Sequence, residues 1–216
     1  MKRAVFYIAY FLTPVVPAFF YINATSSGVD AYSVSVALGV VAFVLLCNQF
    51  ILASRPGWVV TALGLKKLLA FHGTMPLVIL AIAGMHRGLK AGVGFPLDSA
   101  QAIIGSLSFL VFVLAAVFAV VFLATINLPA ALKLREFRKW AQDHLGLSYK
   151  LTRAFHNVTV LAGIAIAVHV LLASSSDLAS NPAGAVWMVA WLLLSLGLYA
   201  RYRLHGRKVP VARASA

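Results

Sequence analysis

The sequence predicts an all-α polytopic membrane protein with a bundle of six transmembrane helices. Three observations support this prediction: 62% of the 216 residues are hydrophobic, only 11% are charged, and the mean hydropathy is +0.94. Soluble domains have nearer half apolar residues and about a quarter charged residues. Water could not solvate such a surface, so we expect membrane lipid to surround the chain.

Six segments are close to the roughly 20 apolar residues that a spanning helix needs. The first begins after Lys2 and Arg3. It is interpreted as a retained span bent by Pro14 and Pro17, because no small-residue cleavage site follows it. The predicted spans are residues 4–22, 31–53, 67–89, 100–126, 147–173 and 183–204. Residues 1–204 are expected to form one domain, followed by a basic cytoplasmic tail, 205–216.

The connection at residues 127–146 is the longest and mixes cations with Leu132, Leu134, Phe137 and Trp140. This composition indicates a short amphipathic helix lying on the membrane surface. A plain solvated loop is the alternative.

The net charge of +13 would suggest nucleic-acid binding in a soluble protein. Here the Lys and Arg residues stand in short stretches between apolar runs, as the positive-inside rule requires. With a cytoplasmic N-terminus, 16 of the 18 cations fall on the inner side, and only Arg87 and Lys90 fall outside. The pattern excludes nucleic acid as a partner and predicts that both termini are cytoplasmic.

Four of the six histidines lie inside two predicted spans, His72 and His86 in the third and His156 and His169 in the fifth. Ionisable groups inside a membrane are costly and need partners. A 14-residue spacing corresponds to about 21 Å and −40° on an α-helix, and a 13-residue spacing to about 20 Å. Both spans run in the same direction, so His72 should lie level with His156, and His86 with His169.

Two imidazoles that face each other inside a helix bundle suit a six-coordinate haem iron. The spacing therefore predicts two b-type haems between the third and fifth spans, each ligated by two histidines, as an electron relay across the membrane. The 13-residue spacing rotates the fifth helix by about −140°. We therefore expect a helix distortion near Gly163 that restores the alignment.

Haem propionates need cations. Arg87 follows His86 directly, Lys90 lies one turn further, and Arg153 precedes His156 by three residues. We predict that these three cations help to bind the cofactors.

The segment LSYKLTRAFHNVTVLAGIAIAVHVLLASSSD, together with the two histidine pairs, resembles the ferric reductase-like transmembrane domain. That family includes NADPH oxidases, eukaryotic ferric reductases and the haem-binding subunit of bacterial methionine sulfoxide reductase systems, and the segment looks most like predicted bacterial ferric reductases. The resemblance implies haem ligation by His72, His86, His156 and His169, outward electron flow and a bacterial inner or plasma membrane location.

Most members of that family continue into a cytoplasmic FAD and NAD(P)H domain, and we expect no such site within this chain. The resemblance then implies a membrane oxidoreductase subunit that is not catalytically complete alone. A flavoprotein reductase or membrane quinol would be its donor, and ferric chelate, oxygen or a periplasmic redox protein its extracytoplasmic acceptor. Family oxidases often carry an aromatic residue between the haems on the fifth helix. Here Phe112, Phe118 or Phe122 of the fourth span could substitute.

An ion or proton transporter that uses intramembrane histidines is the alternative function. Transport sites usually cluster near the midplane with acidic partners, whereas these spans contain no Asp or Glu and the histidines lie at two levels. A purely structural scaffold would leave the four histidines unexplained.

Overall fold

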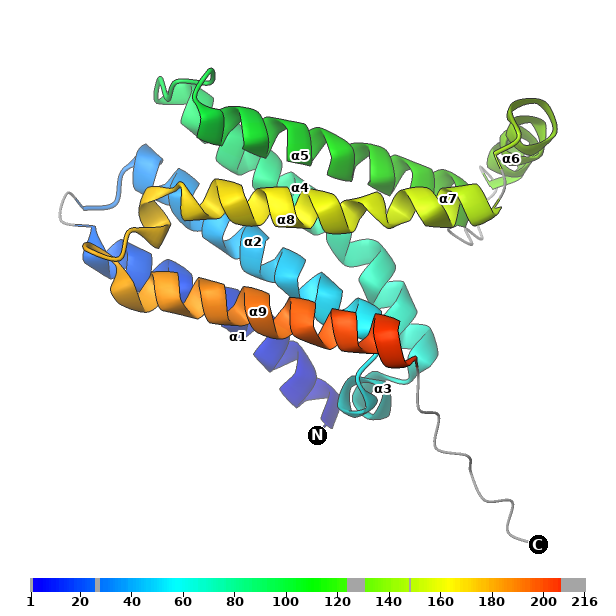
Figure 1. Ribbon diagram of the computed structural model, residues 1–216, viewed down its shortest axis with the longest axis horizontal. Coiled ribbons are helices and arrows are strands. Elements are labelled where there is room, and N and C mark those ends of the chain that lie inside the picture. The colour runs from blue at the N-terminus through cyan, green and yellow to red at the C-terminus, as the bar shows by residue number, and fades with distance from the viewer. Residues whose placement is uncertain (1, 26–27, 124–130, 148, 207–216) are drawn as a thin grey trace, which may run out of the picture.

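The computed structural model describes residues 2–25, 28–123, 131–147 and 149–206, and this part of the chain is helical without strands. It contains six helices that are long and apolar enough to cross a membrane, as predicted. Figure 1 shows them as α1 (Lys2–Ala24), α2 (Ala31–Ser54), α4 (Leu65–Gly92), α5 (Ala100–Phe118) continued by the π-helix η1 (Ala119–Leu123), α7 (Tyr149–His156) continued by α8 (Val158–Leu171), and α9 (Pro182–His205).

The second span, α2, is the centre of the bundle. It packs against α1, α4 and α9, while α5 packs chiefly against α8 (Figure 1). In the most apolar window of α2, 67% of the residues are buried, compared with 11–28% in the other five spans. The outer helices therefore present most of their apolar side chains to the surrounding lipid, as bundle helices in a bilayer do.

A buried polar group joins three of these spans. The Asn48 side chain of α2 donates from Nδ2 to the Tyr10 carbonyl (3.1 Å) and to Thr13 Oγ1 (3.0 Å) of α1. Its Oδ1 accepts from the indole N–H of Trp191 in α9 at 2.8 Å. Hydrogen bonds between helices hold them in register where the hydrophobic effect gives little preference for one partner over another.

Three short helices complete the described chain: α3 (Gly57–Leu63), α6 (Ala131–Leu145) and the 3₁₀-helix η2 (Ser174–Ser176). The sequence pattern did not predict α3. It did predict a helix between the fourth and fifth spans, and α6 confirms that helix. Of the predicted tail, residues 207–216 lie outside the described residues, as does the end of the predicted fourth span beyond residue 123.

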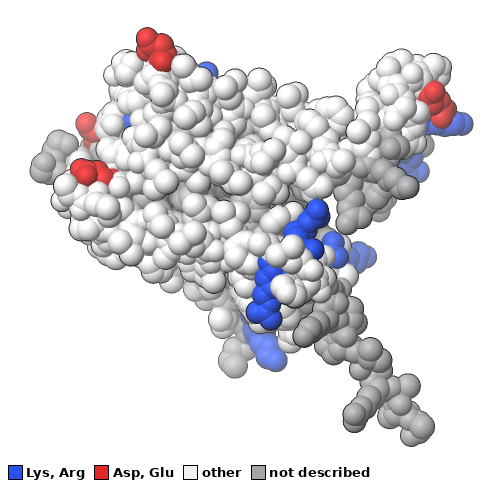
Figure 2. All heavy atoms as spheres, viewed as in Figure 1, with Lys and Arg blue, Asp and Glu red and all other residues white. Residues whose placement is uncertain are grey.

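Charged side chains divide between the two ends of the bundle. Lys and Arg gather at the end that holds α3 and the N-terminal part of α1, and acidic groups lie at the opposite end, while α6 carries side chains of both signs (Figure 2). This asymmetry follows the distribution in the sequence and is typical of a membrane protein with one cytoplasmic face.

Candidate functional site

The structure brings the four intramembrane histidines together in two pairs, one near each end of the bundle. The ring centroids of His72 and His156 lie 6.3 Å apart with an interplanar angle of 89°. Those of His86 and His169 lie 6.2 Å apart at 86°. These are the pairs that the spacing predicts, and the two sites have nearly the same geometry.

Backbone carbonyls orient both rings of the His86–His169 pair. His86 Nδ1 lies 2.7 Å from the Ser35 carbonyl oxygen of α2, and His169 Nδ1 lies 2.7 Å from the Gln101 carbonyl oxygen of α5. A carbonyl only accepts, so Nδ1 carries the proton in each ring and Nε2 keeps its lone pair. Metal-binding histidines commonly have this arrangement, because the second hydrogen bond fixes the tautomer and the ring plane.

Two glycines leave room for these rings. A Cβ atom on Gly39 would lie 2.9 Å from His86 Nδ1, and one on Gly105 would lie 2.7 Å from His169 Nδ1. Both distances are shorter than a Cβ atom tolerates. The two rings can therefore occupy these positions only because Gly39 and Gly105 have no side chain. The spacing argument did not find Gly39, Gly105 or the two carbonyls, because they lie on helices without histidines.

The His72–His156 pair has a different environment. His72 Nδ1 and His156 Nδ1 are buried, and neither has a hydrogen-bond partner within the described part of the chain. A buried polar atom without a partner is costly, and such atoms often mark a place where a ligand binds.

The fifth span is broken between α7 and α8, directly after His156. Asn157 N–H donates to the Ala154 carbonyl and Val160 N–H to the Asn157 carbonyl, both at 3.0 Å, so the chain makes 3₁₀-type bonds here. The Thr159 hydroxyl donates to the His156 carbonyl at 2.6 Å. A 3₁₀ turn advances about 120° per residue instead of about 100°, which rotates His156 toward the face that carries His169.

The predicted distortion at Gly163 is wrong. The α8 helix runs without interruption from Val158 to Leu171, and Gly163 instead allows Phe50 of α2 to approach, since a Cβ there would lie 2.7 Å from Phe50 Cζ. The distortion instead lies at Asn157. There the Thr159 hydroxyl, and not a backbone N–H four residues on, donates to the His156 carbonyl.

The ring separation is compatible with two imidazoles that would share one metal ion. With a metal–nitrogen distance of about 2.0 Å and a ring centroid about 1.1 Å behind each nitrogen, two axial imidazoles have centroids about 6.2 Å apart. Within the described residues no group of three or more His, Cys, Asp or Glu side chains could hold a metal ion.

The histidine-bearing helices α4 and α8 make little direct contact, because α4 packs mainly on α2 and α8 mainly on α5. The small residues of α8 serve this packing in part, since Ala167 belongs to a buried cluster with Val44, Cys47 and Met188.

The predicted cations near the His86–His169 pair already have neighbours. Arg87 donates a hydrogen bond to the Ser106 hydroxyl of α5. Lys90 is buried, and its ammonium nitrogen lies 3.4 Å from the centroid of the Tyr32 ring and 4.5 Å from that of Phe95. The Arg153 side chain lies outside the described residues. Their role toward a cofactor stays a prediction.

Two phenylalanines of the fourth span, Phe118 and Phe122, lie near the level of the His72–His156 pair. Phe118 stacks on Phe122 at 5.7 Å and contacts Phe155 at 4.9 Å, and Phe155 directly precedes His156. Phe118 and Phe122 therefore lie at the level of one histidine pair. An aromatic bridge between two haems would instead lie midway between the two pairs.

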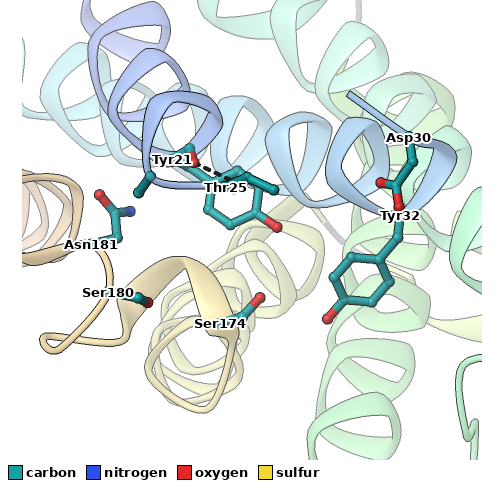
Figure 3. Close-up of a pocket in the computed structure, with 8 residues that line it drawn as sticks. Tyr21, Thr25, Asp30, Tyr32, Ser174, Ser180 and Asn181 are labelled. Atoms are coloured by element: carbon teal, nitrogen blue, oxygen red, sulfur yellow. Dashed lines mark hydrogen bonds between the residues drawn. The ribbon is translucent and has the colours of Figure 1, made fainter. Parts of the chain in front are cut away.

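A polar pocket of about 230 Å³ opens near the other pair (Figure 3). Tyr21, Ser174 and Tyr32 direct hydroxyl groups into the same space. The pocket adjoins the His86 site, because Ser35 Oγ donates to the Tyr32 carbonyl at 2.7 Å while the Ser35 carbonyl accepts from His86. The complete lining is Tyr21, Ala24, Thr25, Asp30, Tyr32, Ser174, Ser180 and Asn181.

Comparison with protein-family models, curated proteins and solved structures finds no match to this chain.

Proposed function

We propose that this chain is the membrane subunit of a ferric reductase-like oxidoreductase and holds two b-type haems, one between His72 and His156 and one between His86 and His169. The observation that carries the proposal is the pair of nearly identical ring separations, 6.3 and 6.2 Å, at two levels of the bundle. Each separation is what two axial imidazoles on one iron require.

Two haem sites at different depths in the membrane would allow electrons to pass across it. His72 with His156, and His86 with His169, would each hold one haem, which would supply a one-electron carrier suited to electron transfer. Helical rise over 13 or 14 residues separates the two levels by about 20 Å, which is about two thirds of the thickness of the bilayer core. The Ser35 and Gln101 carbonyls keep two of the four rings in a fixed orientation.

The charge distribution supports one orientation of the chain in the membrane. With the Lys- and Arg-rich end on the cytoplasmic side of a bacterial inner or plasma membrane, both termini are cytoplasmic, His72 and His156 form the inner site, and His86 and His169 form the outer site. A cytoplasmic flavoprotein or a membrane quinol then supplies electrons to the inner site. The polar pocket lined by Tyr21, Tyr32 and Ser174 would then lie at the extracytoplasmic end of the bundle, where an acceptor would have to bind.

Haem content tests the proposal directly. Purified wild-type protein should contain two haems per chain by a pyridine haemochrome assay. His72→Ala and His86→Ala should each retain about one haem, and the double variant none. His144→Ala and His205→Ala are the matched controls, because both side chains are exposed, His144 on α6 and His205 at the last residue of α9; each should retain two.

Size-exclusion chromatography and circular dichroism separate loss of haem from loss of fold. A monodisperse, helical wild-type protein without a dithionite-reducible b-type spectrum would refute haem binding and favour an ion or proton transporter. Equal haem loss in the control variants would show that the assay reports general instability and not ligation.

A further inference from the structure

The α6 helix lies across the direction of the spans. In Figure 1 it is seen nearly along its own axis, whereas α5 and α8 run in the plane of the view. It is attached to the end of a span, because Arg138 Nε donates to the Val121 carbonyl of η1 at 2.9 Å. A helix that crosses the spans at the end of a bundle lies parallel to the membrane surface.

One side of α6 faces the membrane. Ala141 is fully buried and Leu134 is partly buried, and α6 contacts η1. The side of α6 around Ala141 is therefore covered by protein at the end of a span, and a helix that lies flat at this end turns the same side toward the bilayer. Glu136 and Asp143 lie about 140° and 160° around the helix from Ala141, so they point away from it.

An exposed stripe runs along the edge of this membrane-facing side. It consists of Lys133, Phe137, Trp140 and His144, all within about 100° of Ala141 on the same flank. Phe137 and Trp140 are 49% and 47% exposed. The Phe137 and Trp140 rings stack at 5.8 Å, and the Trp140 and His144 rings at 5.6 Å.

We infer that this stripe is an interfacial site for anionic phospholipid, with the aromatic rings among the headgroups and the Lys133 ammonium on a lipid phosphate. Tryptophan prefers the membrane interface. A basic amphipathic helix with aromatic residues on its apolar side binds anionic lipid surfaces, with each cation contributing about 1 kcal/mol. The outward-pointing acidic residues of α6 suit this orientation, because they avoid the lipid phosphates.

Tryptophan quenching tests where the stripe lies. The full-length protein is placed in nanodiscs of phosphatidylcholine and phosphatidylglycerol whose lipids carry bromine near the glycerol. The difference in quenching between wild type and Trp140→Phe isolates Trp140 from Trp58, Trp187 and Trp191. We expect Trp140 to be strongly quenched. Absence of quenching would place the stripe in water, free for a protein partner, and would overturn the inference.

Lys139 provides a matched control for the charge, because it lies on the same helix but about 160° from Ala141. Native mass spectrometry counts the phosphatidylglycerol molecules retained by each variant. Lys133→Gln should weaken retention about fivefold, which corresponds to about 1 kcal/mol, and Lys139→Gln should not. Equal retention by the two variants would overturn the specific phosphate contact. Haem content plays no part in either readout.

Discussion

Gly105 in α5 leaves no room for a side chain beside His169, so Gly105→Ala is expected to damage one histidine pair selectively. A Cβ atom there would lie 2.7 Å from both Nδ1 and Cε1 of the imidazole. Ordinary carbon contacts begin near 3.4 Å, so the ring must move by about 0.7 Å. The same nitrogen donates to the Gln101 carbonyl, only four residues from Gly105 on the same helix, so this movement disturbs that bond as well.

Overpacking of this kind costs about 1–3 kcal/mol, and a disturbed neutral hydrogen bond about 1 kcal/mol more. A total of about 2–4 kcal/mol corresponds to a loss of affinity at that site of at least tenfold. Haem titration of purified Gly105→Ala should therefore show one tight site, at His72 and His156, and one weakened or missing site, at His86 and His169.

Gly197→Ala in α9 is the control, since a Cβ atom at Gly197 meets nothing within 4 Å. It should bind two haems and be slightly more stable, because alanine favours a helix by about 1 kcal/mol over glycine. Two tight sites and an unchanged spectrum in Gly105→Ala would refute the reasoning, as would equal loss in Gly197→Ala.

Three further predictions concern other residues. Asn48→Leu should lower thermal stability in detergent by about 2 kcal/mol, at about 0.6 kcal/mol for each lost interhelical hydrogen bond and with the Trp191 indole left unpaired, while haem content stays at two. Hydrogen bonds from the Ser33 hydroxyl and N–H lower the pKa of Asp30, so the stability that this cap of α2 contributes is present at neutral pH and is lost as the pH falls through the lowered pKa; Asp30→Asn should remove this part of the acid sensitivity in melting curves recorded across pH. Arg87→Gln should shift the midpoint potential of the outer haem to lower values, because a nearby positive charge stabilises the reduced, less positive iron; redox titration that leaves both midpoints unchanged would contradict this.

Much of the architecture follows from local pattern. A span is recognised by length and composition alone, so six spans could be predicted without knowing their packing. Positions 72, 86, 156 and 169 pair across the bundle because helical rise fixes their heights. The short α3 helix escaped prediction because GWVVTAL is too short to span and has no distinctive start signal.

The details that shape the histidine pairs could not be predicted, because they depend on contacts far apart in the sequence. Gly39 and Gly105 are ordinary helical glycines until His86 and His169 are placed against them. The sequence predicted a distortion of the fifth span, but near Gly163 and not at Asn157. The distortion depends on the competition between the backbone ladder and the Thr159 hydroxyl, and such a competition leaves little trace in hydrophobic pattern.

Electron transfer across a sealed membrane tests the central claim most directly. Proteoliposomes with entrapped ferricyanide are exposed to an external reductant that does not cross the lipid, and protein-free liposomes serve as the blank. Wild-type protein loaded with haem should reduce the entrapped ferricyanide, and His86→Ala and His156→Ala, which each interrupt one site, should not. Ferricyanide that stays oxidised with the wild-type protein would contradict a two-site electron path through this chain. Reduction by both variants as fast as by the wild-type protein would contradict it as well.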